Sequence, residues 1–304
     1  MTIVSISVPT GDLEPPTPGK RVSFDRPHPL DINQYSSPPS YPSSYTDEVR
    51  ALINEHSEST SLKLCRLITI TSASGAFDPY QAACRNKFSC ATCSPYLLEL
   101  AQAHIAEVLS PSEGALFLTL TLADEQDHHL GIRLRNLLQC WEKSFNTGSW
   151  MTDFKTKNGI TGLARSMEIT FPMPGNKSQN FGHPHLHVAV ALDQKPSQET
   201  ADALLSHWVS TAQHQGFRAS IHGQRGRVVA GPDDRDTIAF YLTEQHALRA
   251  SRKEHSRYPG DLLSSVLATG DADDLTMLRT FWNVTKGKHK VSYSGVFRPV
   301  TAVQ

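Results

Sequence analysis

The sequence predicts an α+β protein in which an antiparallel sheet carries two helices on one face. The first supporting observation is a succession of segments in the order strand, helix, strand, strand, helix, strand. The strand segments are short apolar runs, and one of them alternates clearly with polar residues. The helix segments repeat apolar residues at intervals of three and four. This order is typical of the ferredoxin-like (RRM-like) arrangement.

Composition excludes two classes of protein. The chain has 304 residues and a formal net charge of −1, and no apolar run approaches the ~18 residues of a membrane-spanning helix. Residues 1–9 lack the basic and apolar parts of a secretory signal. Five cysteines, three of them clustered, fit a reducing compartment better than a disulfide framework. We therefore expect a cytoplasmic protein without membrane association. The net charge gives no indication of nucleic-acid binding, which must rest on local patches.

The chain divides into three predicted parts. Residues 1–45 contain nine of the 19 prolines and little apolar periodicity, so we expect a disordered Pro/Ser-rich arm. Residues 60–110 form a cysteine-rich segment that ends in a helix over about 95–108. Residues 113–300 form the main domain with a basic C-terminal tail.

The cysteine-rich segment predicts a small zinc module. Cys90 and Cys93 have the CxxC spacing that lets two thiolates share one Zn²⁺, with Cys84 close by. Cys65 could complete a tetrahedron. The alternative is that these cysteines are ordinary buried thiols.

The main domain contains the elements of the predicted sheet in order. We expect strands at residues 115–122, 164–171 and 181–192 and a fourth ending at 227–230, with helices over 130–145 and 198–213 and from Pro232 onward.

The strand at 181–192 carries the candidate metal ligands. His185 and His187 are two residues apart and therefore point to the same face. The neighbouring strand can present Glu168 beside them, which gives two imidazoles and one carboxylate. Such a set suits Mn²⁺ or Mg²⁺, although zinc or another transition metal could compete. His183 is a secondary candidate. The alternatives are an exposed histidine pair and a solvent-facing Glu168.

Three motifs carry a resemblance to a known family. Residues 117–121 (FLTLT), 183–187 (HPHLH) and 240–243 (FYLT) resemble the successive motifs of HUH endonucleases, and most closely those of plasmid rolling-circle replication initiators, the Rep proteins. The cysteine group and the tail at 282–298 look like those of the same initiators. The resemblance covers about residues 60–300.

The resemblance implies a metal-dependent DNA nickase with an HUH endonuclease domain. His185, His187 and Glu168 would bind the metal. Tyr241, about two turns into its helix, would attack the scissile phosphate and leave a 5′-phosphotyrosine and a free 3′-OH primer. The implied partners are single-stranded or hairpin origin DNA and a host helicase and polymerase, and a homodimer stays open. Close relatives carry a water-activating glutamate at the position of Thr237, so only Asp236 or Asp234 could take that role.

Two basic runs are candidate DNA contacts, although each could equally be a solvated face. They are Arg249, Arg252, Lys253 and Arg257 after the tyrosine, and Lys286, Lys288, Lys290 and Arg298 in the tail. Two further local charges, Arg225 and Arg227, lie before the tyrosine helix. Three rival functions remain open. The chain could bind DNA hairpins without cleaving them, it could serve transposition or conjugative transfer, or it could be an unrelated metal hydrolase that does not use Tyr241.

Overall fold

A computed structural model of the chain describes residues 4–7, 43–63, 65, 69–72, 80–81, 84–90, 93–111, 114–123, 129–174, 182–244 and 256–299. Most of the expected arm lies outside these residues. Within it, however, Val4–Ser7 form strand β1 where no regular structure was expected. β1 pairs with β2 (Thr69–Ser72), which pairs with β3 (Tyr80–Gln81). In the described part of the chain, no helix combines the length and apolarity that membrane crossing requires.

The centre of the molecule is a five-stranded antiparallel sheet of order β7-β4-β6-β5-β8. Its strands are β4 (Ala115–Thr121), β5 (Ile160–Thr170), β6 (His183–Leu192), β7 (Arg225–Val229) and β8 (Val291–Gly295). The predicted α+β class with an antiparallel sheet is confirmed. The edge strand β8 was not expected, because its five residues lie within the tail and have little apolar content.

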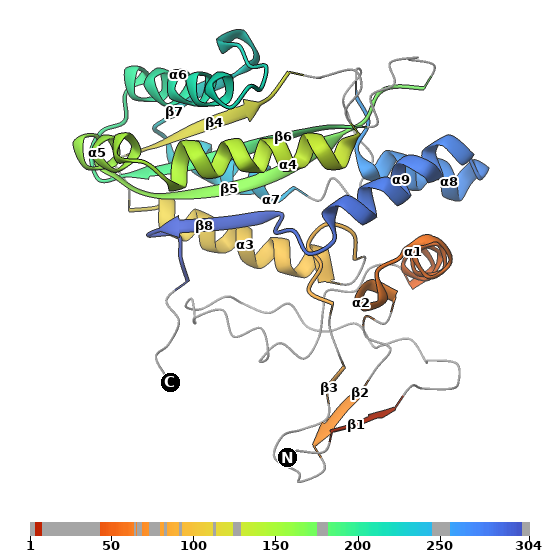
Figure 1. Ribbon diagram of the computed structural model, residues 1–304. Coiled ribbons are helices and arrows are strands. Elements are labelled where there is room, and N and C mark those ends of the chain that lie inside the picture. Colours follow the sequence, from red (N-terminus) through yellow and green to blue (C-terminus); the bar gives the residue numbers. More distant parts are fainter. Residues whose placement is uncertain are drawn as a thin grey trace.

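One face of the sheet, here called the core face, packs against α4 (Leu130–Trp141) and α6 (Gln198–His214), as Figure 1 shows. Leu118, Leu186 and Val188 project to this face and are fully buried. The helix predicted over 130–145 continues from α4 as a π-helix (Glu142–Asn146), and a further helix, α5 (Ser149–Lys157), follows before β5.

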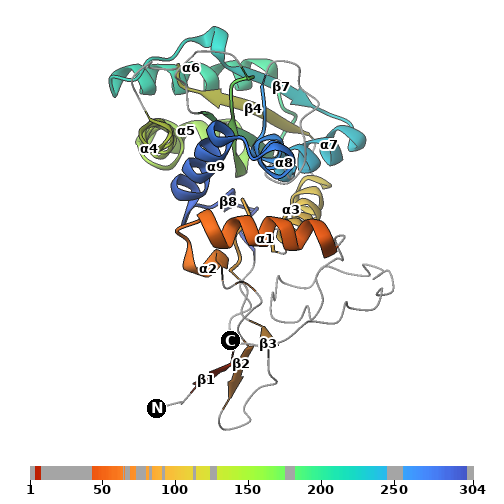
Figure 2. The same cartoon turned by 90° about the vertical axis from the view of Figure 1, so that its right-hand side faces the viewer.

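The opposite face, here called the site face, carries two more helices. α3 (Cys93–Leu109) and α7 (Pro232–Thr243) pack over small residues of the strands, which let the helices approach closely (Figure 2). These small residues are Ala115, Ala164, Ala189 and Ala191. Because Leu98 and Ile105 of α3 belong to this buried cluster, the cysteine-rich segment is continuous with the sheet through α3. The histidine end of β6 lies beside the C-terminal end of α7, where His187 contacts Tyr241.

The remaining α-helices contribute apolar residues to the same buried cluster as the cysteines. They are α1 (Ser43–His56), α2 (Thr60–Lys63), α8 (Pro259–Thr269) and α9 (Ala272–Thr285). Phe281 of α9 meets Phe88 of the cysteine segment edge to face, with ring centroids 6.1 Å apart, and meets Phe171 at 6.4 Å. The apolar core therefore runs from the sheet through α9 to the cysteines.

Arg257 was predicted as a DNA contact of the basic run after Tyr241, but it is a structural residue. Its guanidinium is nearly buried and donates to Asp274 Oδ2 at 2.8 Å and to the carbonyl of Pro172 at 2.9 Å. Its backbone also exchanges two hydrogen bonds with Phe171, of 2.7 and 2.8 Å. The side chain thus ties the segment before α8 to the end of β5 and to α9.

Replacing Arg257 by methionine is expected to lower the free energy of unfolding by about 3–5 kcal/mol, because it leaves the carboxylate of Asp274 buried without its cation. Urea unfolding followed by tryptophan fluorescence measures the change. The exposed Arg279→Met is the matched control and should shift stability by less than about 0.5 kcal/mol. The double variant Arg257→Met/Asp274→Leu should regain part of the loss. A loss below about 1 kcal/mol in the single variant would contradict the assigned role.

Candidate active site and metal centres

Strand register brings the predicted metal ligands together. Glu168 of β5 lies directly opposite His185 of β6, and β6 pairs on its other side with β4, where Thr119 is opposite His187. Side chains at these positions share the site face because they are opposed or two residues apart. The expected pairing of the Glu168 strand with the histidine strand is confirmed.

The two imidazoles converge on the Glu168 carboxylate. His187 Nε2 lies 2.8 Å from Oε2, and His185 Nε2 lies 3.2 Å from Oε1. The ligand atoms of the three residues lie within 4.8 Å of one another, so they could hold a divalent cation. Glu168 and His187 are buried, and the His185 side chain is 12% exposed. Carboxylate oxygens together with imidazole nitrogens suit Mn²⁺ or Mg²⁺, and zinc or another transition metal could compete for the same ligands.

Threonines of β4 hold the histidine rings from the side away from the carboxylate. Thr119 Oγ1 lies 3.1 Å from His187 Nδ1, which leaves Nε2 directed at Glu168. Such an outer hydrogen bond fixes the ring orientation of a metal-binding histidine. Thr121 Oγ1 lies 2.7 Å from His183 Nε2. His183 thus has Thr121 as a partner of its Nε2, and it is not one of the three clustered ligands.

Tyr241 lies against this cluster. Its ring centroid is 4.9 Å from that of His187, edge to face at 90°, and 5.6 Å from that of Phe117 at 84°. Burial raises the pKa of Tyr241 to about 12, the charges of Glu168 and Glu244 add to the shift, and Arg225 opposes it. The phenol is therefore protonated at neutral pH unless a nearby cation changes its surroundings.

Asp236 is not brought to this site. It is exposed, and it lies five residues before Tyr241, which turns it about 140° around the helix from the tyrosine. It is also not among the residues that line the cavity beside Tyr241, whereas Thr237 is. Thr237 donates to the backbone carbonyl of Asp233 at 2.8 Å.

Two residues close to Glu168 were not predicted as part of the metal site. Tyr258, 5% exposed, has a raised pKa because it is buried and because Glu168 lies close enough to accept its hydrogen bond. Lys290, which we predicted as a DNA contact, is buried instead, and burial lowers its pKa to about 8 while Glu168 opposes the shift. The regular spacing of the lysines at 286, 288 and 290 did not indicate that only Lys290 would be buried. Lys290 comes directly before β8, which begins at Val291, and its side chain is directed inward.

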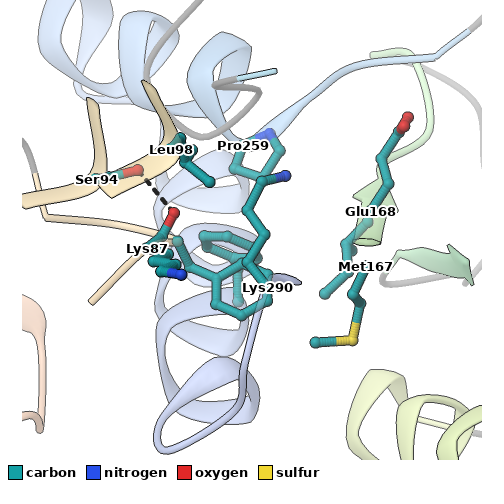
Figure 3. Close-up of a pocket in the computed structure, with 10 residues that line it drawn as sticks. Lys87, Ser94, Leu98, Met167, Glu168, Pro259 and Lys290 are labelled. Carbon is teal, nitrogen blue, oxygen red and sulfur yellow. Dashed lines mark hydrogen bonds between the residues drawn. The ribbon is translucent and has the colours of Figure 1, made fainter. Parts of the chain in front are cut away.

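Lys290 and Glu168 line a cavity of about 10 Å³ between the site and the cysteine segment (Figure 3). That volume is close to the room that a single water needs. Lys87 and Ser94 line its other side, where the Ser94 hydroxyl donates to the Lys87 carbonyl at 2.7 Å. The Glu168 carboxylate points away from the Lys87 side, so the cavity lies behind this carboxylate.

The four predicted zinc ligands form a second cluster. The sulfurs of Cys65, Cys84, Cys90 and Cys93 lie within 4.8 Å of one another, with Cys65 3.4 Å from Cys93 and 3.5 Å from Cys90. Tetrahedral coordination at 2.3 Å would separate them by about 3.8 Å. These cysteines could therefore hold a metal such as zinc. Hydrogen bonds from the other three thiols, with Cys65 the largest contributor, lower the pKa of Cys93 and favour its thiolate.

The backbone also prepares this cluster for charged sulfur. Amides donate to three of the sulfurs: Cys84 N to Cys65 at 3.4 Å, Asn86 N to Cys84 at 3.4 Å and Cys93 N to Cys90 at 3.3 Å. Arg85, at φ 54°, has the left-handed conformation that turns the chain between Cys84 and Asn86. The thiol of Cys140 is separate and lies in α4.

The other predicted DNA contacts divide into two groups. Arg252 and Lys253 lie outside the described residues, as does Arg249. Lys286 and Lys288 are exposed at the end of α9 and in the turn before β8, and Arg298 is exposed after β8.

Comparison of the chain with protein-family models, curated proteins and solved structures finds no match. The interpretation of the two clusters therefore rests on their own geometry.

Replacing His187 by alanine is expected to weaken Mn²⁺ binding by about 100-fold or more. Loss of an outer-shell partner of a metal ligand typically costs about 10–100-fold in affinity, and this substitution removes a ligand itself. Titration of the metal-free protein, followed by the electron paramagnetic resonance signal of free Mn²⁺, measures the affinity. His183→Ala on the same strand is the matched control and should change it by less than about tenfold. Equal effects of the two substitutions would remove His187 from the ligand set.

Replacing Cys93 by serine is expected to abolish stoichiometric zinc in the purified protein, because a neutral hydroxyl cannot replace a thiolate in the tetrahedron. Elemental analysis measures the zinc content. Cys140→Ser is the control: burial raises the pKa of that thiol to about 12, and it lies outside the cluster, so its zinc content should equal that of the unmodified chain. Zinc retained in Cys93→Ser, or absent from the unmodified protein, would contradict a structural zinc site.

Proposed function

We propose that the chain is an HUH-type replication initiator that nicks one strand of origin DNA and carries the new 5′ end on Tyr241. The observation that carries the proposal is the contact between Tyr241 and His187, with ring centroids 4.9 Å apart, beside a cluster of two histidines and one glutamate. A nucleophile adjacent to a cation site is what tyrosine-based phosphoryl transfer needs.

The topology supports the proposal. The order β7-β4-β6-β5, with α4 between β4 and β5 and α6 between β6 and β7, agrees with the order expected of a ferredoxin-like sheet to which β8 would be an added strand. The sequence motifs that resemble HUH endonucleases lie on β4, β6 and α7, the three elements that meet at the site. The contact between Tyr241 and His187 favours this proposal over an unrelated metal hydrolase, which would not require the tyrosine.

Tyr241 acts as the nucleophile in this proposal. Its phenolic oxygen forms a bond to the scissile phosphorus while the bond from phosphorus to the 3′ oxygen breaks. The phenol gives up one proton and the departing 3′ oxygen gains one, so the products are a 5′-phosphotyrosine and a 3′-OH. The phosphodiester energy is kept in the new ester, and the reverse reaction rejoins a strand without ATP.

The buried carboxylate and imidazoles supply the electrostatics of the site. A divalent cation held by Glu168, His185 and His187 would offset the negative charge that grows on the phosphate oxygens during attack. Thr119 keeps the His187 ring oriented, and Tyr258 and Lys290 lie close to Glu168. The proposal includes no residue that activates water at termination, since Asp236 is turned away from Tyr241 and neither Asp236 nor Asp234 lines the cavity beside it.

The test is a denaturing-gel assay with 3′-labelled, single-stranded oligonucleotides of randomised sequence and Mn²⁺. The unmodified protein should give an SDS-resistant labelled adduct, because the downstream fragment stays attached through its 5′ phosphate. EDTA, Tyr241→Phe and His187→Ala should each abolish the adduct. Tyr241→Phe should still bind the oligonucleotides.

Tyr293→Phe is the matched control, because the Tyr293 hydroxyl is buried and removed from the metal cluster. It should leave the adduct intact. An adduct that survives Tyr241→Phe but disappears in Tyr258→Phe would move the nucleophile to Tyr258. Binding without any adduct would favour a DNA-hairpin-binding protein that does not cleave.

A further inference from the structure

A large cavity that borders Tyr241 is not explained by the metal cluster. It encloses about 940 Å³, near the upper end of the ~300–1,000 Å³ typical of ligand sites. Its walls come from α6, α7, β4 and the edge strand β7, together with the short helix η2 (Ile221–Gly223). We call it the β7 groove. Tyr241 and Thr119 lie where the groove meets the candidate active site.

Two arginines give the groove its charge. Arg225 and Arg227 alternate with Gly226 on β7, so both project to the site face about 6.8 Å apart along the strand. Both are exposed, and neither forms an ion pair with another residue that the structure describes. Among the described residues of the lining, the one carboxylate is Asp202, which accepts a hydrogen bond from Gln198 at 2.8 Å. The described lining therefore carries net positive charge.

Apolar surface lies beside these arginines. The Arg227 guanidinium carbon is 5.7 Å from the centroid of the Phe117 ring. Ile221, 45% exposed, and Ile238 and Leu205 complete the apolar lining. Cationic groups next to an aromatic ring and aliphatic side chains fit a ligand with both phosphates and flat apolar rings. Duplex DNA would hide its bases from such a surface, whereas a single strand offers them.

We propose that the β7 groove binds the single DNA strand adjacent to the scissile phosphate. Arg225 and Arg227 contact successive phosphates, and an unpaired base lies against Phe117 and Ile221. The inference rests on the proposed function, because it takes Tyr241 as the point of cleavage. It adds the path by which the strand reaches that point: along the edge strand and between α6 and α7.

Binding can be measured apart from cleavage. We would use the full chain carrying Tyr241→Phe, in EDTA, with a fluorescent oligo-dT of about 16 nucleotides, the upper end of common single-strand site sizes. Fluorescence anisotropy gives the dissociation constant over a range of salt concentrations. Arg225→Gln and Arg227→Gln should each weaken binding about five- to tenfold at 0.1 M salt. Each should also reduce the slope of log K against log salt by about 0.7.

Two comparisons distinguish binding in the β7 groove from nonspecific electrostatic attraction to the protein surface. Arg279→Gln, which removes an exposed arginine of α9, should leave both the affinity and the slope nearly unchanged. Ile221→Ser should weaken binding about threefold with the slope unchanged, because it removes an apolar base contact and no charge. A duplex of the same length should bind more weakly than the single strand.

The outcomes distinguish this inference from the nickase proposal. If the Arg225 and Arg227 variants bind the single strand as tightly as the Arg279 variant does, the proposed role of the β7 groove is wrong, even if the covalent adduct forms. A protein that binds no single strand would overturn it as well. Weakened binding with reduced slopes would support the groove, even if no adduct is found.

Discussion

The pairing register of three strands is the constraint on which the site depends. Glu168 opposite His185, and Thr119 opposite His187, bring a carboxylate, two imidazoles and a hydroxyl to one patch of the site face. A slip of β5 by one residue would replace Glu168 with an apolar neighbour and turn the carboxylate into the leucine-rich core face. The cost of burying that charge fixes the register, so the packing that stabilises the sheet also assembles the cluster.

Small residues decide where the cluster is open. Alanines occupy one half of the site face and let α3 and α7 pack directly on the strands, while histidines and threonines occupy the other half. The C-terminal end of α7 therefore reaches the boundary between the two halves, where Tyr241 meets His187. On the far side of Glu168, Lys290 and the cysteine segment close the site off. The candidate chemistry is confined to the remaining side, toward β4 and β7.

Much of this was predictable because period and parity are local properties. The alternation of residues in β6 predicted that His185 and His187 share one face, and the order of the segments predicted the antiparallel sheet. The spacing of the cysteines predicted three members of the second cluster, Cys84, Cys90 and Cys93, and Cys65 was the candidate for the fourth. Nothing local indicated that Lys290 would be buried or that Tyr258 would approach Glu168, since both depend on contacts across more than 80 residues of chain. The edge arginines of β7 were visible as charges, but the cavity between α6 and α7 is a tertiary feature.

Phe117 connects the parts of the site that the sequence shows separately. Its ring is stacked with His187 at 5.7 Å, meets Tyr241 edge to face at 5.6 Å, and lies 5.7 Å from the Arg227 guanidinium. Tyr241 is therefore held by aromatic contacts of its ring. Such ring contacts do not require the phenolic oxygen, so they can persist when that oxygen loses its proton or becomes esterified. In the proposed reaction, the same contacts would hold Tyr241 during the attack on the strand and during the later return of the strand.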